Sequence, residues 1–198
     1  CSMILPIYVF GHDALRRETE PVTANTEAVQ TLIDNMIETM RAANGLGLAA
    51  PQVGRTERIF VVDLLPLADE LRADGVEFPE QPMVFINPQI TWESETTGKF
   101  EEGCLSIPDV REPVRRPERV QVEYLDRNFD EQSYEMGDML ARVVQHEYDH
   151  LEGVLFTDHL SAFRRRLLRR TLRQMANGDI SAEYPLRTAD GDTIPAAA

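Results

Sequence analysis

One short segment, His146-Glu147-Tyr148-Asp149-His150, constrains this sequence more than any other. It has the form H-E-x-x-H, and on a helix two residues four positions apart lie on one face, one turn apart. Both imidazoles can then reach one metal ion, with Glu147 beside them to take a proton from water at the metal. The segment therefore predicts a helix that carries a catalytic metal site. A charged surface helix with two histidines is the alternative.

Helical spacing of apolar residues also predicts a helix earlier in the chain. It begins after Thr26, a suitable N-cap, and ends at Asn44-Gly45. Its apolar face consists of Val29, Leu32, Ile33, Met36, Ile37 and Met40. A second helix, with Asp138 as N-cap, is expected to reach about Gly153 and to carry the H-E-x-x-H segment.

Strands are predicted between these helices, where the apolar runs are short or alternate with polar residues. They are 59–62, 83–86 and 120–124, and a polar surface loop is expected at 66–82. Because strands and helices do not alternate as βαβ units, we expect an α+β fold. A single domain over 1–175 fits the length of 198 residues, with 176–198 as a flexible tail.

Composition excludes several classes of protein. The net charge of −14 argues against a general DNA- or RNA-binding surface, and no segment approaches the about 20 apolar residues of a membrane helix. Two cysteines cannot staple a chain of 198 residues, and Cys1 is expected to be incidental. Without the pattern of a secretory signal at its start, the sequence favours a cytoplasmic protein.

The class of metal site depends on a third ligand. After Gly153, the position where some zinc proteases carry a third histidine is Phe156, and His159 comes three residues too late. The later glutamates, Glu152 and Glu183, are poorly placed for a ligand. Upstream, Cys104 is the credible soft donor, and one cysteine with two histidines leaves a coordination position free for water, as catalytic sites do. Alone, Cys104 would equally suit a small buried side chain.

A glycine-rich segment, Gly45-Leu46-Gly47-Leu48-Ala49-Ala50-Pro51-Gln52, follows the first predicted helix. Its glycines allow the backbone to approach a ligand closely, and Gln52 offers an amide donor. It lacks the lysine and the preceding strand of a phosphate loop. A helix cap and turn is the alternative interpretation.

Together, residues 45–52, Glu102-Gly103-Cys104-Leu105-Ser106 and Gln145–Leu151 resemble the three motifs of peptide deformylases, in the same order. These enzymes remove the formyl group from the N-terminal methionine of new bacterial proteins. The resemblance covers about residues 3–160. It implies an α+β fold in which antiparallel or mixed sheets pack around the H-E-x-x-H helix, with a C-terminal helix. It also implies one Fe²⁺ per chain, for which Zn²⁺, Ni²⁺ or Co²⁺ can substitute.

The resemblance also assigns roles to individual residues. Cys104, His146 and His150 would hold the metal, and Glu147 would act as general base and then as general acid. The Gln52 side chain and the Leu105 backbone N–H would stabilise charge on the formyl oxygen. Backbone and side chains along the cleft would bind the peptide and its methionine: Leu46, Gly47, Gly103, Arg111, Met139, Arg142 and Val143. Arg142 departs from the family pattern, which has an apolar residue there, so it either pairs with an acid or solvent, or reshapes the methionine pocket.

The sequence also contains a basic helix, predicted over 162–175. Six of its residues between 164 and 173 are arginines. It is either a solvated helix that pairs with carboxylates of this acidic protein, or an element of residues 163–173 that docks on ribosomal RNA, as the resemblance implies. The rival functions are a zinc endopeptidase and a non-catalytic, ribosome-associated metal-binding protein.

Overall fold

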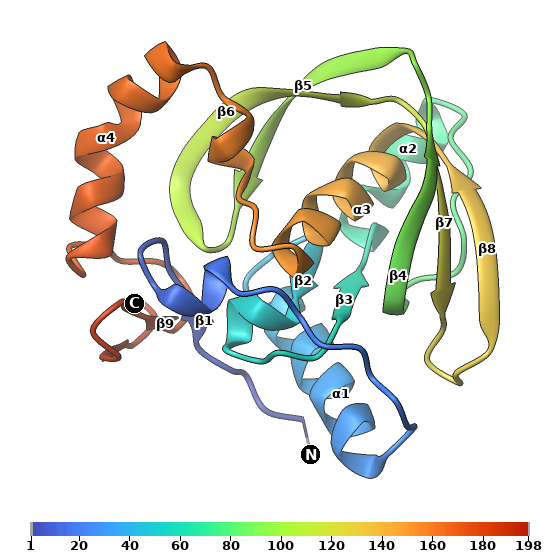
Figure 1. The fold of residues 1–198 in the computed structure, drawn as a ribbon, viewed down its shortest axis with the longest axis horizontal. Helices are drawn as coiled ribbons and strands as arrows, with labels where there is room; N and C mark the ends of the chain where they lie inside the picture. Colours follow the sequence, from blue (N-terminus) through green and yellow to red (C-terminus); the bar gives the residue numbers. More distant parts are fainter. Residues whose placement is uncertain (1, 198) are drawn as a thin grey trace.

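Two helices pack against opposite faces of a central antiparallel sheet in the computed structural model, which describes residues 2–197 (Figure 1). The strand order of this sheet is β2-β3-β4-β7-β8. Its strands are β2 (Gly47–Ala49), β3 (Ile59–Val62), β4 (Met83–Glu93), β7 (Val120–Leu125) and β8 (Glu131–Met136). The helices are α1 (Glu27–Ala42) and α3 (Asp138–Leu151).

Strand β3 shows why the sheet is covered on both faces. All its residues are buried, and they alternate between two apolar clusters. Ile59 and Val61 belong to the cluster that contains the apolar face of α1, whereas Phe60 and Val62 belong to the cluster that contains α3. Because side chains alternate between the two faces of a strand, β3 packs against α1 on one face and against α3 on the other.

A long antiparallel hairpin covers the other side of α3. It consists of β5 (Thr97–Cys104) and β6 (Ile107–Pro117), joined by Leu105 and Ser106. In Figure 1 it curves over α3, while the last helix, α4 (Ala162–Ala176), stands at the edge of the molecule. This arrangement confirms the expected α+β architecture around the H-E-x-x-H helix. Short elements complete it: η1 (Asp13–Arg16), η2 (Ala50–Val53), η3 (Leu65–Leu67), α2 (Ala68–Ala73) and η4 (Phe156–His159).

Helix boundaries largely follow the local signals of the sequence. Thr26 caps α1, its side chain accepting a hydrogen bond from the Val29 N–H, and Ser161 caps α4 in the same way. The predicted cap of α3 is wrong, because Gly137 is the N-cap and Asp138 is the first helical residue. The predicted loop at 66–82 is also partly wrong, since it contains α2, a helix too short to show apolar periodicity.

The expected flexible tail is the largest difference. After α4 the chain turns back and adds β9 (Leu186–Arg187) beside β1 (Ile7–Tyr8), with β10 (Thr193–Ile194) on its outer side. Leu186 is fully buried in the cluster that contains α1. The segment is held by strand pairing with the N-terminal part of the chain, which the local composition of 176–198 does not reveal.

Within residues 2–197, no helix combines the length and apolar character needed to cross a membrane.

Candidate metal centre

Three potential metal ligands converge where α3 meets the end of β5. Cys104 is the last residue of β5, and His146 and His150 lie one turn apart on α3. One ligand atom from each residue lies within 4.8 Å of the others, and the Cys104 Sγ is 3.3 Å from the His150 Nε2. The structure thus brings together the three residues that the sequence singled out. The second cysteine, Cys1, lies outside the described residues.

The His146 ring is oriented by a buried carboxylate. Its Nδ1 lies 3.0 Å from the Glu102 Oε2, and Arg116 contacts the same carboxylate through two nitrogens, at 2.6 and 2.9 Å. Burial alone would raise the pKa of Glu102, but the hydrogen bonds from His146 and Arg116 outweigh it and hold the pKa well below its usual range. Glu102 is therefore ionised, and its contact with Nδ1 leaves the Nε2 of His146 free to face the metal position.

The pKa values of the two histidines shift in opposite directions, although burial lowers both. Burial lowers the pKa of His150 well below its ordinary value, and the positive charge of His146 lowers it further. For His146, burial also lowers the pKa, but the hydrogen bonds with Cys104 and Glu102 outweigh it, and the pKa rises well above its ordinary value. A metal ion would compete with a proton for the ligating nitrogen of each imidazole, because a ligating imidazole must be neutral.

Glu147 lies beside the cluster in a confined space. Its side chain is buried, and within residues 2–197 its Oε2 has no hydrogen-bond partner. Burial raises the pKa of Glu147 to about 7. The carboxylate packs directly against Gly47 of β2, where an added Cβ would lie 2.4 Å from the Glu147 Oε1. Glycine at position 47 is therefore required by the close approach of this carboxylate.

Gln52 is held by hydrogen bonds at both ends of its amide. The Oε1 accepts from the Ala49 N–H at 2.9 Å, and the Nε2 donates to the Ser106 Oγ at 3.2 Å and lies 3.5 Å from the Cys104 Sγ. The amide nitrogen is thus directed at the ligand cluster. Leu105 follows Cys104 in the same turn, so its backbone N–H is at the edge of the cluster.

The donor set fits a divalent transition metal. One thiolate and two imidazoles suit iron or zinc, and three protein ligands leave a coordination position for water or substrate. The Glu147 Oε2 is buried and has no partner among the described residues 2–197, so it can accept a hydrogen bond from such a water.

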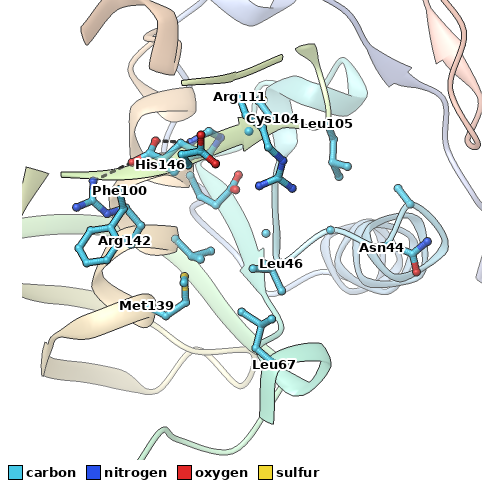
Figure 2. Close-up of a pocket in the computed structure, with 18 of the residues that line it drawn as sticks. Asn44, Leu46, Leu67, Phe100, Cys104, Leu105, Arg111, Met139, Arg142 and His146 are labelled. Atoms are coloured by element: carbon cyan, nitrogen blue, oxygen red, sulfur yellow. Dashed lines mark hydrogen bonds and ion pairs between the residues drawn. The ribbon is translucent and has the colours of Figure 1, made fainter. Parts of the chain in front are cut away.

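The cluster opens into a cleft of about 1750 Å³ between the hairpin, α3 and the segment that follows α1. The cleft lining includes every residue expected along the substrate path: Leu46, Gly47, Gln52, Gly103, Cys104, Leu105, Arg111, Met139, Arg142, Val143, His146 and Glu147. His150 lies beneath them, almost completely buried. Figure 2 shows Met139 and Arg142 on one side of the cleft, with Leu46 and Asn44 on another.

Arg142 pairs with an acid, as the first of the two sequence interpretations expected. Its Nη1 lies 3.0 Å from the Glu102 Oε1 and donates to the Val114 carbonyl, and its Nη2 donates to the Gly98 carbonyl at 3.0 Å. The guanidinium also lies over the Phe100 ring, 5.1 Å from its centroid (Figure 2). The hairpin therefore binds the charged end of Arg142, and the apolar stem of the side chain faces the cleft.

Sequence reasoning missed the residues that surround the ligands. The sequence motif around Cys104 contains Glu102 but does not indicate its role, and no motif points to Arg116, which joins Glu102 to Asp149 at 2.8 Å. These residues are distant in sequence and meet through the β5–β6 pairing. The local sequence signal for them is an acid two residues before the cysteine.

Comparisons with known proteins agree with this geometry. The family model described as "Polypeptide deformylase" matches residues 4–166. A peptide deformylase of Salinibacter ruber is 67% identical, covering 98% of this chain and 99% of that protein. A crystal structure of peptide deformylase from Ehrlichia chaffeensis superposes with a TM-score of 0.80 at 36% identity, over 89% of this chain and 99% of the other. A structure of the Ehrlichia chaffeensis enzyme in complex with actinonin gives 0.78 at 37%, over 88% and 98%.

Proposed function

The chain belongs to the peptide deformylase family, and on that premise we propose that it hydrolyses the N-formyl group from the N-terminal formyl-methionine of nascent polypeptides, releasing formate. The observation that carries this proposal is the cluster of Cys104, His146 and His150, beside the Glu147 Oε2, which has no hydrogen-bond partner within residues 2–197. We further propose that residues 1–175 form one catalytic domain, against which the chain after α4 packs through β9 and Leu186.

Cys104, His146 and His150 would hold one metal ion per chain, Fe²⁺ in the cell and Zn²⁺, Ni²⁺ or Co²⁺ as substitutes. When bound, the ion supplies Lewis-acid chemistry, polarising the formyl carbonyl and acidifying water. The thiolate donates more charge than a third imidazole would, so a ferrous ion here oxidises easily. That chemistry favours a reducing compartment, and we infer that the protein works in the cytoplasm.

Glu147 moves the proton. Its Oε2, which has no partner among residues 2–197, accepts a proton from the water that attacks the formyl carbon. The same carboxyl then delivers this proton to the amine nitrogen as the carbon–nitrogen bond breaks. The products are formate and a free N-terminus.

Charge on the formyl oxygen is met by two donors of this chain. An amide nitrogen carries two hydrogens, so Gln52 can keep its bond to the Ser106 Oγ and turn the hydrogen that points to the Cys104 Sγ toward the formyl oxygen. The Leu105 N–H is the second donor. In other enzymes the loss of one such donor costs about 3–4 kcal/mol of transition-state stabilisation.

The backbones of Leu46, Gly47 and Gly103 would align the peptide, and the exposed Arg111 would steady its chain. Met139, Arg142 and Val143 would form the methionine pocket. Because the Arg142 guanidinium is engaged by Glu102 and two carbonyls, it does not offer a free charge to a substrate carboxylate. We expect formyl-Met and formyl-norleucine peptides to be good substrates and a formyl-Glu peptide to be a poor one. Preferential hydrolysis of formyl-Glu would contradict this role of Arg142.

The basic helix α4 would dock on ribosomal RNA near the emerging chain. All six arginines between 164 and 173 are exposed, and within residues 2–197 only Arg164 pairs with an acid, Glu112 at 3.5 Å. The protein's own carboxylates thus leave most of this charge for a phosphate backbone. Replacement of Arg165, Arg169 and Arg173 by Gln should abolish cosedimentation with ribosomes, whereas replacement of the exposed Arg72 on α2 should not. Equal cosedimentation of all variants would exclude α4 as the docking element.

The test of the main proposal is formate release from formyl-Met-Ala after anaerobic loading with Fe²⁺. Release of formate with one ion per chain supports it. Cleavage of internal bonds in unformylated peptides would instead indicate an endopeptidase. Metal binding without either reaction would indicate a non-catalytic metal-binding protein, although Gln52, Leu105 and Glu147 all line the cleft.

A further inference from the structure

The chain after α4 returns to the active-site cleft. We call residues 180–197 the return segment. Pairing of β9 with β1 anchors it to the rest of the protein. Its two ends are joined by a hydrogen bond from the Ala197 N–H to the Ala182 carbonyl at 2.8 Å. Part of it forms one wall of the cleft that holds Cys104 and Glu147. The residues of this wall are Ser181, Ala182, Glu183, Tyr184 and Ala197.

Tyr184 connects the return segment to the catalytic turn. Its hydroxyl donates a hydrogen bond to the Leu105 carbonyl oxygen at 2.8 Å, across 79 positions of sequence. The ring is half-buried in the apolar cluster that contains α1, where Leu105 also packs. Burial raises the pKa of Tyr184, and the nearby Cys104 and Asp109 raise it further, so the hydroxyl stays a donor at neutral pH.

The turn that receives this bond depends on contacts from outside the hairpin. The β5–β6 register shifts between Gly103 and Cys104, so the regular ladder is interrupted just before the turn. Besides the bond from Tyr184, the turn accepts one from the Gln52 Nε2 to the Ser106 Oγ at 3.2 Å and one from the Phe10 N–H to the Ser106 carbonyl at 2.9 Å. Of these, only the bond from Tyr184 holds the Leu105 carbonyl.

We infer that Tyr184 is a positioning residue for deformylation. Its hydroxyl holds the carbonyl of the Leu105–Ser106 peptide. This bond restricts rotation of the Leu105 backbone, and with it the direction of the Leu105 N–H toward the formyl oxygen. The inference rests on the proposed function. Without this bond the turn would still be tied through Ser106, so Leu105 would rotate while Cys104 stayed in place. A donor displaced in this way weakens transition-state stabilisation more than substrate binding.

The test is Tyr184→Phe, which keeps the ring and removes only the hydroxyl. Tyr134→Phe is the matched control, because Tyr134 lies on the outer strand β8 of the central sheet. The kcat and KM for formyl-Met-Ala-Ser, the metal content and the melting temperature are measured for both variants and the wild type. We expect the kcat of Tyr184→Phe to fall about 10-fold, with KM and metal content unchanged, and Tyr134→Phe to behave as wild type.

Three results for Tyr184→Phe would overturn the inference. The first is a kcat equal to that of the wild type. The second is a higher KM with an unchanged kcat, which would mean that Tyr184 only lines the cleft. The third is a lower metal content with unchanged activity per bound metal, which would mean that the substitution acts on Cys104. Absence of formate release by the wild type would be a failure of the proposed function, and is thus distinguished from a failure of the role of Tyr184.

Discussion

Gly47→Ala is expected to inactivate the enzyme by moving its general base. The added Cβ would lie 2.4 Å from the Glu147 Oε1 and 2.7 Å from both the Cδ and the Cγ. Ordinary contacts begin at about 3.4 Å, so the carboxylate must shift by about 1 Å. Neither side can yield easily, because Gly47 pairs with Val62 in the sheet and Glu147 is only 4% exposed.

Displacement of a catalytic group by about 1 Å costs about 100-fold in rate. We therefore expect the kcat for formate release to fall about 100-fold. The ligands of the metal lie elsewhere, so metal content should stay at one ion per chain. Formate release under saturating formyl-Met-Ala, with metal analysis of the same sample, measures both quantities.

The matched control is Gly137→Ala at the N-cap of α3. There an added Cβ would meet its nearest neighbour, the Arg119 Cγ, at 3.6 Å, an ordinary contact. This variant should keep its activity, and its melting temperature should fall slightly, because alanine is a poorer N-cap than glycine. A kcat for Gly47→Ala within twofold of the wild type would refute the reasoning, since the carboxylate would then tolerate the displacement or play no part in the reaction.

Three further outcomes follow from the site. Glu147→Ala should retain the metal and lose turnover, and turnover near the wild-type rate would remove Glu147 from the proton-transfer role. Cys104→Ser should lower the metal content after dialysis, whereas an unchanged content would reject Cys104 as a ligand. Arg142→Met should destabilise the fold by about 2 kcal/mol, because it takes one cation from the buried Glu102 while Arg116 remains. For a chain of this length that lowers the melting temperature by about 4–8 °C, and an unchanged melting temperature would show that the pair is energetically neutral.

Elements with local signals could be predicted from the sequence. Thr26 and the apolar periodicity after it predicted α1, and the apolar run 59–62 predicted β3 with the bounds that the structure shows. The ligand spacing on α3 is equally local, because residues four apart on a helix share a face whatever surrounds them. For the same reason the candidate ligands and the general base could be named before the fold was known.

The contacts that support the site depend on packing between segments that are distant in sequence. The burial of Arg142 against Glu102 depends on how the β5–β6 hairpin lies across α3, over 40 positions of sequence. The return of the chain after α4 depends on pairing between β9 and β1, at opposite ends of the sequence. Neither contact can be recognised from periodicity or composition in the segments that form it. The stabilising free energy of each contact comes from residues that only folding brings together. The sequence thus determined which groups carry the chemistry, and packing between distant segments decided which groups hold them in place.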